Sequence, residues 1–340
     1  MLVDMVTVSL CMMCKKDDYS FLDTCLTNVA GGVDEIIIVV DKIDQEIEDM
    51  VKGFNVKLIE HEYNNSSAEQ RNISIKNAKM DWILVLDADE ILALDDLIEL
   101  KGLVKDKDYI ACVLNQINYT DDQNQVRFFK TDNDITRRFG FKGCFTVPAV
   151  RFFKNNMGLY FTRRVREMVD EVIDQKGLSN KVLNTNIPMH HLKALKRGDV
   201  LKDTEIRYLR LLEMEVADNP ENFKALFDIG TINLFTLKNP ERAIQNFKEA
   251  LKTKTDFIEA KLNLAFAYGE IKNYEEALEI YKDILKQRVD YFTLSSISTC
   301  YFFIKKYKEA IEYLEKALAA EPERKEEIEK KIEIIKKIMG

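Results

Sequence analysis

Residues 82–90 read Trp82-Ile83-Leu84-Val85-Leu86-Asp87-Ala88-Asp89-Glu90, five apolar residues followed by a short acidic run. A continuous apolar run of this length is typical of a strand that is buried on both faces of a parallel sheet. Asp87 and Asp89 then fall at the carboxyl end of the strand, where open α/β sheets bind their ligands. Two neighbouring carboxylates are costly in a protein interior unless a positive group binds them. The pair is therefore a candidate cation site, although Asp89 or Glu90 could instead cap a helix near residue 95.

The residues on either side of this run alternate between strand and helix patterns. Apolar strands are predicted at 6–10 and 36–40, a shorter strand at 56–60, and helices at 18–30 and 67–79. Strands separated by helices of this length build a mostly parallel sheet with right-handed crossovers. Asp41 follows the second of these strands, so we expect it at the same sheet edge as Asp87. Alternating runs in residues 108–190 predict a mixed sheet that completes the domain, with a polar loop over the site at 121–142.

From about Asp203 onward the pattern is helical and periodic. Small residues recur at intervals of 34 and 33 positions, at Ala243, Ala277 and Ala310. Large side chains recur four positions after each of them, at Phe247, Tyr281 and Leu314. This period and this small/aromatic pattern resemble the tetratricopeptide repeat. We expect about three repeats in an all-α domain over residues 203–340, with a capping helix at 323–338.

Composition restricts the classes of protein and partner. The chain has 340 residues, enough for two domains, and a formal net charge of -8, which disfavours nucleic acid as a partner. Six scattered cysteines in a chain of this size predict no disulfide framework and favour a reducing compartment. No apolar run approaches the roughly 20 residues of a membrane helix, and no signal-peptide pattern is present. We therefore expect a cytoplasmic protein without an integral membrane segment.

A longer stretch around the two aspartates resembles the family 2 glycosyltransferases, which have the GT-A fold. Residues 68–90 follow that family's pattern of Ala-x-x-Arg-Asn, a helix, and Ala-x-x-Asp-Trp-Ile-Leu-x-Leu-Asp-Ala-Asp-Glu. Residues 149–155 and 163–167 are similar to its Arg-x-Phe and Val-His-Glu segments, and 187–191 to a segment that ends in histidine. The resemblance covers about residues 5–215. It implies a GT-A domain, an α/β fold with a Rossmann-like mixed sheet, over residues 1–202.

The resemblance also implies a function. We expect an inverting glycosyltransferase that moves a sugar from a nucleoside diphosphate sugar, with UDP-hexose or UDP-N-acetylhexosamine as the expected donor, to a peptide, protein or glycan. Asp41, Arg71 and Asp87 are the implied donor-binding residues. Asp89 and a histidine, His191 in preference to His190, would hold Mn²⁺ or Mg²⁺.

Glu167 is the implied general base for the acceptor nucleophile. Structural roles for two of the candidate residues stay open beside these assignments. Glu167 could pair with Arg163 or Arg164 as a surface carboxylate, and Arg71 could form an ion pair with Glu69 or Asp87.

Two departures from the family pattern keep a second interpretation open. Lys42-Ile43-Asp44-Gln45 replaces a small Gly/Ser/Thr-rich turn, and Arg166 stands where histidine is commoner. The alternative is a catalytically inactive transferase-like scaffold that binds proteins through its repeats. A nucleotidyltransferase is disfavoured because residues 11–18 contain no glycine for a triphosphate loop.

A tetratricopeptide tail accompanies one branch of the family, which includes bacterial peptide glycosyltransferases of the sublancin type that modify cysteine. Kinship of fold does not fix the acceptor. The repeats could serve a homodimer or capture an acceptor, and the sequence leaves both open. It also leaves open the sugar, the acceptor atom and the linkage.

Overall fold

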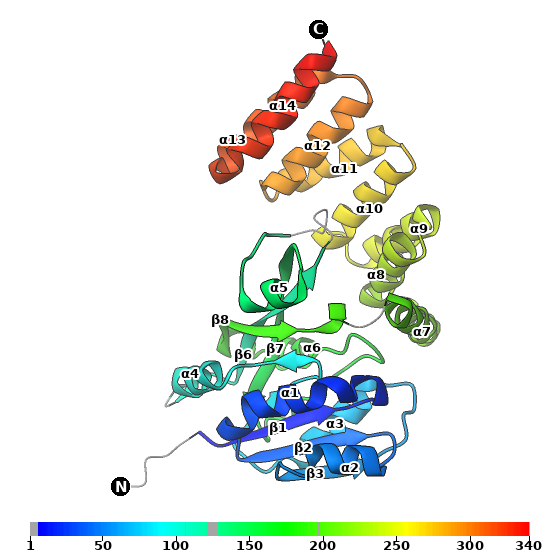
Figure 1. Ribbon diagram of the computed structural model, residues 1–340. Coiled ribbons are helices and arrows are strands. Elements are labelled where there is room, and N and C mark those ends of the chain that lie inside the picture. Colours follow the sequence, from blue (N-terminus) through cyan, green and yellow to red (C-terminus); the bar gives the residue numbers. More distant parts are fainter. Residues whose placement is uncertain (1–5, 106, 122–127, 196–197, 340) are drawn as a thin grey trace. The chain divides into compact units, whose positions relative to one another are not determined.

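The computed structural model describes residues 6–105, 107–121, 128–195 and 198–339. The chain divides into two compact units, residues 1–200 and 201–340. The first is built around a β-sheet, and the described part of the second consists of helices (Figure 1). The domain limits expected from the sequence, 1–202 and 203–340, stay a prediction.

A mixed sheet forms the centre of the first unit. In the described residues it has eight strands in the order β3-β2-β1-β4-β7-β6-β8-β5. Their bounds are β1 Val8–Met13, β2 Glu35–Val40, β3 Val56–Glu60, β4 Trp82–Val85, β5 Glu90–Ile91, β6 Ala111–Thr120, β7 Gly143–Lys154 and β8 Val182–His191. Strands β3, β2, β1 and β4 are parallel neighbours, whereas β7 runs antiparallel to β4 and β6. The predicted α/β class with a mixed sheet is confirmed.

Helices cover both faces of the parallel half of the sheet. On β1, Leu10 and Met12 face one core, and Cys11 between them faces the other. The first face packs against α1 (Tyr19–Val29), α2 (Gln45–Val51) and α4 (Leu94–Val104). The second packs against α3 (Ser67–Asn77) and α6 (Asp170–Gln175). Because neither face meets water, the central strands are apolar at successive positions, which explains their unbroken hydrophobic runs.

The structure corrects two predictions, one about the cap of α4 and one about the segment 121–142. The N-cap of α4 is Ala93, whose side chain makes no capping hydrogen bond, so the alternative that Asp89 or Glu90 caps this helix is wrong. The segment expected as an irregular loop at 121–142 contains a short helix, α5 (Asp134–Phe139). Residues 122–127 of that segment lie outside the described residues.

The second unit is a stack of helices. The element before the repeats is α7 (Gly198–Asp218), and a π-helical turn, Ile232–Thr236, continues α8. The repeat helices are α8 (Phe223–Thr231), α9 (Pro240–Thr253), α10 (Ile258–Glu270), α11 (Tyr274–Leu285), α12 (Tyr291–Phe303) and α13 (Tyr307–Ala320). The bounds of the last helix, α14 (Lys325–Met339), nearly match those of the predicted capping helix at 323–338, and α14 packs against α13. No described helix combines the length and the apolar character that crossing a membrane requires.

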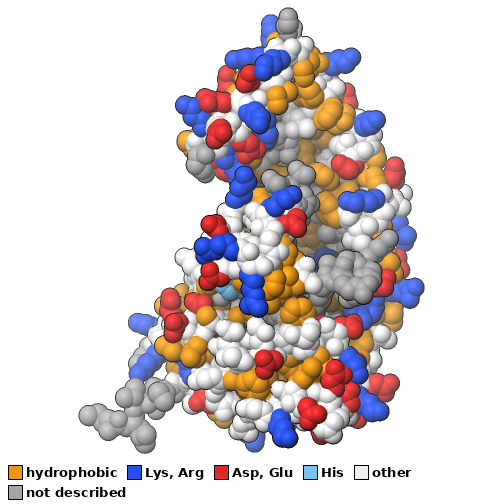
Figure 2. Space-filling view, in the orientation of Figure 1, with side chains coloured by type: hydrophobic (Ala, Val, Ile, Leu, Met, Phe, Trp, Pro, Cys, Tyr) orange, Lys and Arg blue, Asp and Glu red, His pale blue; other side chains and the backbone are white. Residues whose placement is uncertain are grey.

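The sequence period has a direct structural cause. Ala243, Ala277 and Ala310 are fully buried, which lets the two helices of each repeat approach closely. The turn within each repeat contains a lysine in the left-handed region, at φ 53°, 61° and 63° for Lys238, Lys272 and Lys305. A left-handed residue at this position ends a helix and reverses the chain. On the visible face of this unit, acidic and basic side chains are interspersed with hydrophobic ones (Figure 2).

Candidate active site

Asp87 and Asp89 lie in the short connection between β4 and β5, at the carboxyl end of β4. The pairing of β5 with β8 fixes what they meet, because Glu90 stands opposite His191 in an antiparallel register. The N–H of Leu192 also donates to the carbonyl oxygen of Asp89 at 2.8 Å. The end of β8 therefore lies against this connection, residues 86–89, which we call the acidic loop.

His191 is oriented toward Asp89 by a residue of β6. Its Nδ1 lies 2.8 Å from Oδ1 of Asn118, and its Nε2 lies 3.5 Å from Oδ2 of Asp89. Because an amide oxygen only accepts, Nδ1 donates to Asn118, so Nε2 donates to Asp89 when the ring is protonated and offers its lone pair to a cation when the ring is neutral. Burial acts to lower the pKa of His191, but hydrogen bonding to Asp89 and the charge of the acidic loop raise it above its ordinary value.

His190, the other candidate metal ligand, contacts Tyr119 instead of Asp89. Its Nδ1 lies 2.7 Å from the hydroxyl of Tyr119, and its ring stacks on the same tyrosine. Successive residues of a strand point to opposite sides, so only one of the two histidines can face Asp89. The arrangement favours His191 over His190 as a metal ligand.

The donor set fits a divalent cation that is shared with a phosphate ligand. Among the described residues no group of three His, Cys, Asp or Glu side chains is placed to hold a metal. Asp89 and His191 offer two ligands, and Mg²⁺ characteristically takes one or two protein ligands and fills its remaining positions with water and substrate phosphates. The charge of Asp89 also acts to raise the pKa of Asp87, because the two carboxylates repel each other. A 2+ ion would offset that repulsion.

Arg71 connects the acidic loop to the predicted general base. It lies on α3 and is 3% exposed; its Nη2 is 2.6 Å from Oδ1 of Asp87, and its Nε is 2.6 Å from Oε1 of Glu167. Burial acts to raise the pKa of Asp87, but Arg71 and Arg151 hold it below its ordinary value. The Nη1 of Arg71 is buried and has no hydrogen-bond partner among the described residues. The ion pair with Asp87 considered from the sequence is therefore present.

Glu167 lies in a tight loop, residues 162–168, and pairs with Arg71. Thr162 and Met168 close this loop through reciprocal backbone hydrogen bonds of 2.8 and 3.3 Å. Within it, Arg163 and Arg166 adopt φ values of 73° and 50°, a conformation unfavourable for residues with a side chain. Such strain is often retained at functional sites. The side chain of Glu167 is only 9% exposed, so it is not the surface carboxylate that was one interpretation of the sequence.

Glu90 and Arg151 support the acidic loop, and neither was among the site residues expected from the sequence. The carboxylate of Glu90 is fully buried; it accepts the N–H of Asp87 at 2.8 Å, Nη2 of Arg151 at 3.0 Å and Nε2 of Gln116 at 2.5 Å. Its place in the acidic run was a signal that could have identified Glu90. Nothing in the local sequence distinguishes Gln116 or Asn118.

Asp41 lies directly after β2, as predicted from the sequence, and it is exposed. Its Oδ1 accepts a hydrogen bond of 2.7 Å from Nε2 of Gln70. Gln70 and Arg71 are neighbours on α3, and they contact Asp41 and Asp87 respectively. One helix therefore connects the ends of β2 and β4.

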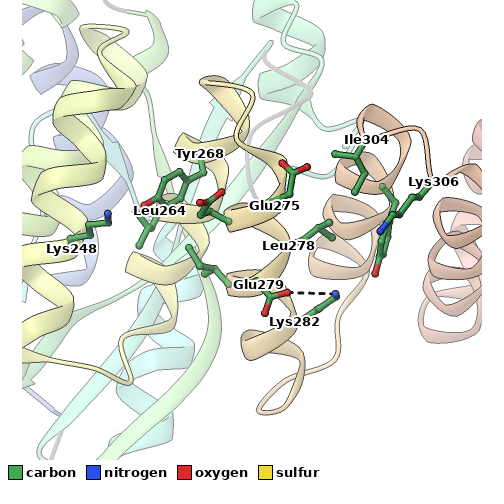
Figure 3. A pocket seen from close by; sticks show the side chains of 12 residues that line it. Lys248, Leu264, Tyr268, Glu275, Leu278, Glu279, Lys282, Ile304 and Lys306 are labelled. Carbon is green, nitrogen blue, oxygen red and sulfur yellow. Dashed lines mark ion pairs between the residues drawn. The ribbon is translucent and has the colours of Figure 1, made fainter.

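A cavity of about 500 Å³ lies in the second unit, between helices of successive repeats (Figure 3). Two lysines on its wall, Lys248 and Lys282, lie over the rings of Tyr268 and Tyr301 at 5.4 and 5.5 Å. Lys282 also pairs with Glu279 at 3.8 Å. Its lining mixes both charge signs and indicates no particular class of ligand.

Comparison with known proteins places the sheet unit in a family. Residues 9–178 match the family model described as glycosyl transferase family 2. The chain belongs to glycosyl transferase family 2. The matched range contains Asp41, Arg71, Asp87, Asp89 and Glu167, whereas His191 lies beyond it. Two tetratricopeptide repeat models match residues 234–295 and 293–324, so the predicted repeats are confirmed.

A curated relative from Synechococcus elongatus, described as a TPR repeat-containing protein, is 26% identical over 255 residues. The match covers 73% of this chain and 57% of that relative, so the chain spans little more than half of the relative's length. Among solved structures, MamA from Desulfovibrio magneticus RS-1 matches 40% of this chain and 80% of its own, with 18% identity and a TM-score of 0.36. A thermophilic TPR protein from Thermus thermophilus matches 40% and 75%, with 15% identity and a TM-score of 0.34. TM-scores this low carry no inference about function.

Proposed function

We propose that the sheet unit of this family 2 glycosyltransferase is a metal-dependent inverting enzyme that uses a UDP-sugar, a hexose or an N-acetylhexosamine. Family membership indicates a glycosyltransferase with a nucleotide-sugar donor. The observation that carries the finer proposal is the Asp89–His191 pair, in which Asn118 turns Nε2 of the histidine toward the carboxylate. An oriented carboxylate and imidazole in an acidic loop are suited to Mn²⁺ or Mg²⁺.

Each candidate residue takes one role in this proposal. Asp41 binds the base, and Asp87 lies toward the ribose. Arg71 directs its unpaired Nη1 to the diphosphate, where a guanidinium is a strong hydrogen-bond donor. Asp89 and His191 hold the divalent cation, which when bound stabilises negative charge on the leaving diphosphate.

Glu167 is the proposed general base. Arg71 fixes its Oε1, and the other carboxylate oxygen would accept the proton of the acceptor nucleophile. The nucleophile forms its bond to the anomeric carbon as the bond to the diphosphate breaks on the opposite side. A single displacement of this kind inverts the anomeric configuration.

The acceptor in this proposal is a peptide or protein, with a glycan as the alternative, and the reaction takes place in the cytoplasm. The repeats favour a protein acceptor because stacked repeats form extended binding surfaces. A second copy of the chain would use the same kind of surface, and sedimentation analysis distinguishes a homodimer from a monomer. All six cysteines are buried free thiols, which is consistent with a reducing compartment.

Calorimetric titration of UDP and UDP-sugars tests the proposal. Binding should require Mn²⁺ or Mg²⁺ and disappear with EDTA. Asp89→Ala and His191→Ala should each weaken metal-dependent binding at least about tenfold. His190→Ala is the matched control and should stay within about threefold of the wild type. Equal losses for the two histidine variants would contradict the assignment of His191.

One observation favours a second candidate, a catalytically inactive transferase scaffold, because the proposed base is held in an ion pair with Arg71 at 2.6 Å. Release of UDP from each UDP-sugar, with candidate acceptors including cysteine-containing peptides, separates the two functions. Turnover that Glu167→Gln abolishes supports the enzyme. Metal-dependent binding without turnover on any donor supports the scaffold.

A further inference from the structure

The buried side-chain amide of Gln70 forms a hydrogen bond with Asp41, the exposed aspartate at the end of β2. Gln70 is 1% exposed and lies in the first turn of α3. Its Nε2 donates to Oδ1 of Asp41 at 2.7 Å and to the carbonyl oxygen of His61 at 3.3 Å. Both N–H bonds of the amide are therefore used. The reverse orientation would place Oε1 against two acceptors, so the contacts fix which way the amide points.

The consequence is an asymmetric carboxylate at Asp41. An ionised carboxylate only accepts hydrogen bonds, and it can receive two donors side by side, one on each oxygen. Gln70 already uses one of the two lone pairs of Oδ1, while the side chain as a whole remains exposed to a ligand. Oδ2, which Gln70 does not contact, is therefore the stronger acceptor that Asp41 presents to a nucleobase.

Polar side-chain atoms also lack partners in the segment between β3 and α3, whose His61 carbonyl oxygen accepts from Gln70. Nδ1 of His61, the hydroxyl of Tyr63 and Oγ of Ser67 are buried and have no hydrogen-bond partner among the described residues. Lys15, which follows β1, places its Nζ 4.8 Å from the centroid of the Tyr63 ring. Buried polar atoms without partners are rare in native proteins, and a group of them needs an explanation.

We propose that Gln70 sets the base specificity of the donor site by weakening Oδ1 of Asp41 as an acceptor, which favours uracil over guanine. This inference rests on the proposed function, binding of a nucleoside diphosphate sugar by this unit. Uracil offers a single imide N–H at N3, which one oxygen satisfies. Guanine offers N1–H and the 2-amino group side by side and needs both oxygens. Cytosine presents an acceptor at N3, which a carboxylate repels.

The test compares three nucleotides on two proteins. Dissociation constants of UDP, GDP and IDP are measured with Mn²⁺ on the full chain and on Gln70→Met, with the purines in competition against UDP. IDP is the matched probe because hypoxanthine has N1–H but lacks the 2-amino group. In the wild type UDP should bind most tightly, and GDP and IDP should agree within about twofold. In Gln70→Met the freed oxygen should make GDP at least about fivefold tighter than IDP.

A ratio of dissociation constants separates a specificity role from a structural one, because a general loss of folding weakens GDP and IDP alike. Three results overturn the inference. The first is GDP binding more than about twofold tighter than IDP in the wild type. The second is a ratio of the two dissociation constants that Gln70→Met leaves unchanged. The third is binding of purines by neither protein, which would mean exclusion by size. If Gln70→Met does not fold, the wild-type comparison of GDP with IDP decides. If UDP itself does not bind the wild type, the proposed function and this inference are both wrong.

Discussion

At the scale of single residues, the site depends on charges that are shared across the acidic loop. Arg71 pairs with Asp87 and Glu167, while Arg151 pairs with Glu90 and lies 3.9 Å from Asp87. Glu90 also accepts the backbone N–H of Asp87. Asp87 is consequently held by its side chain and its main chain at once, and Asp89 follows it in a fixed loop. A ligand site for a cation needs this kind of support, because small displacements change coordination geometry.

Glu90→Ala tests that support. Removing the carboxylate leaves the guanidinium of Arg151 without its closest partner in a buried environment, where breaking an ion pair typically costs ~3–5 kcal/mol. We expect the free energy of unfolding, measured by urea titration, to fall by ~3 kcal/mol. Glu99→Ala on the exposed side of α4 is the control and should change it by less than ~0.5 kcal/mol. Similar effects of the two variants would show that Glu90 does not anchor the loop.

At the scale of elements, the repeat helices depend on how closely their backbones approach. Gly230 on α8 lies so near the ring of Phe247 on α9 that an added Cβ would meet Cε1 at 2.6 Å and Cδ1 at 2.8 Å. Phe247 is itself fully buried. Gly269 on α10 has no atom within 4 Å of the corresponding position. Replacement by alanine would therefore create a clash at Gly230 and none at Gly269.

The pair gives a matched prediction. Gly230→Ala should lower the free energy of unfolding by ~1–2 kcal/mol, because overpacking against Phe247 exceeds the gain in helix propensity. Gly269→Ala should raise it by up to ~0.5 kcal/mol, since only propensity changes near a helix end. Urea titration of both variants checks the signs. A stabilising Gly230→Ala would mean that the α8 and α9 backbones are not in close contact there.

At the scale of the whole molecule, each unit has a hydrophobic core of its own. In the helical unit the clusters follow the repeats, and the last one joins α12, α13 and α14 through Leu294, Leu314 and Ile328. In stacked repeats stability comes from each repeat and its contacts with neighbours, and terminal repeats need a cap. The isoleucines of α14 that face α13 therefore contribute to the stability of the unit.

We expect residues 198–340 to fold without the sheet unit. The fragment should give a helical circular dichroism spectrum and unfold cooperatively in urea. Within it, Ile328→Ala removes a fully buried side chain and should cost ~2–4 kcal/mol. Ile334, which is 50% exposed, is the control, and its replacement by alanine should cost less than ~1 kcal/mol. A fragment that stays unfolded would show that the helical unit is not an independent domain.

Much of the architecture was predictable because it is locally encoded. The strand at Trp82–Val85 is an apolar run with clear ends, the strand at Val56–Glu60 is a shorter segment with three apolar residues, and both were located within a residue. The repeats were recognisable because each one repeats the same small residue at the same buried helix contact. The strand-end position of Asp41 and Asp87 also followed from the pattern alone. Burial, periodicity and strand direction are properties of short segments, so a sequence records them directly.

The chemistry of the site depends on contacts between distant segments. Neither the contact of His191 with Asp89, nor that of Arg71 with Glu167, nor the hydrogen bond from Gln70 to Asp41 is encoded within a short segment. A shift of one residue in strand register exchanges the two faces of a strand, so only the pairing of β5 and β8 could turn His191 and not His190 toward Asp89. The sequence by itself determined the fold class, the repeats and the strand-end aspartates. Only the tertiary structure decided which side chains meet, because that depends on register and on helix packing across the sheet.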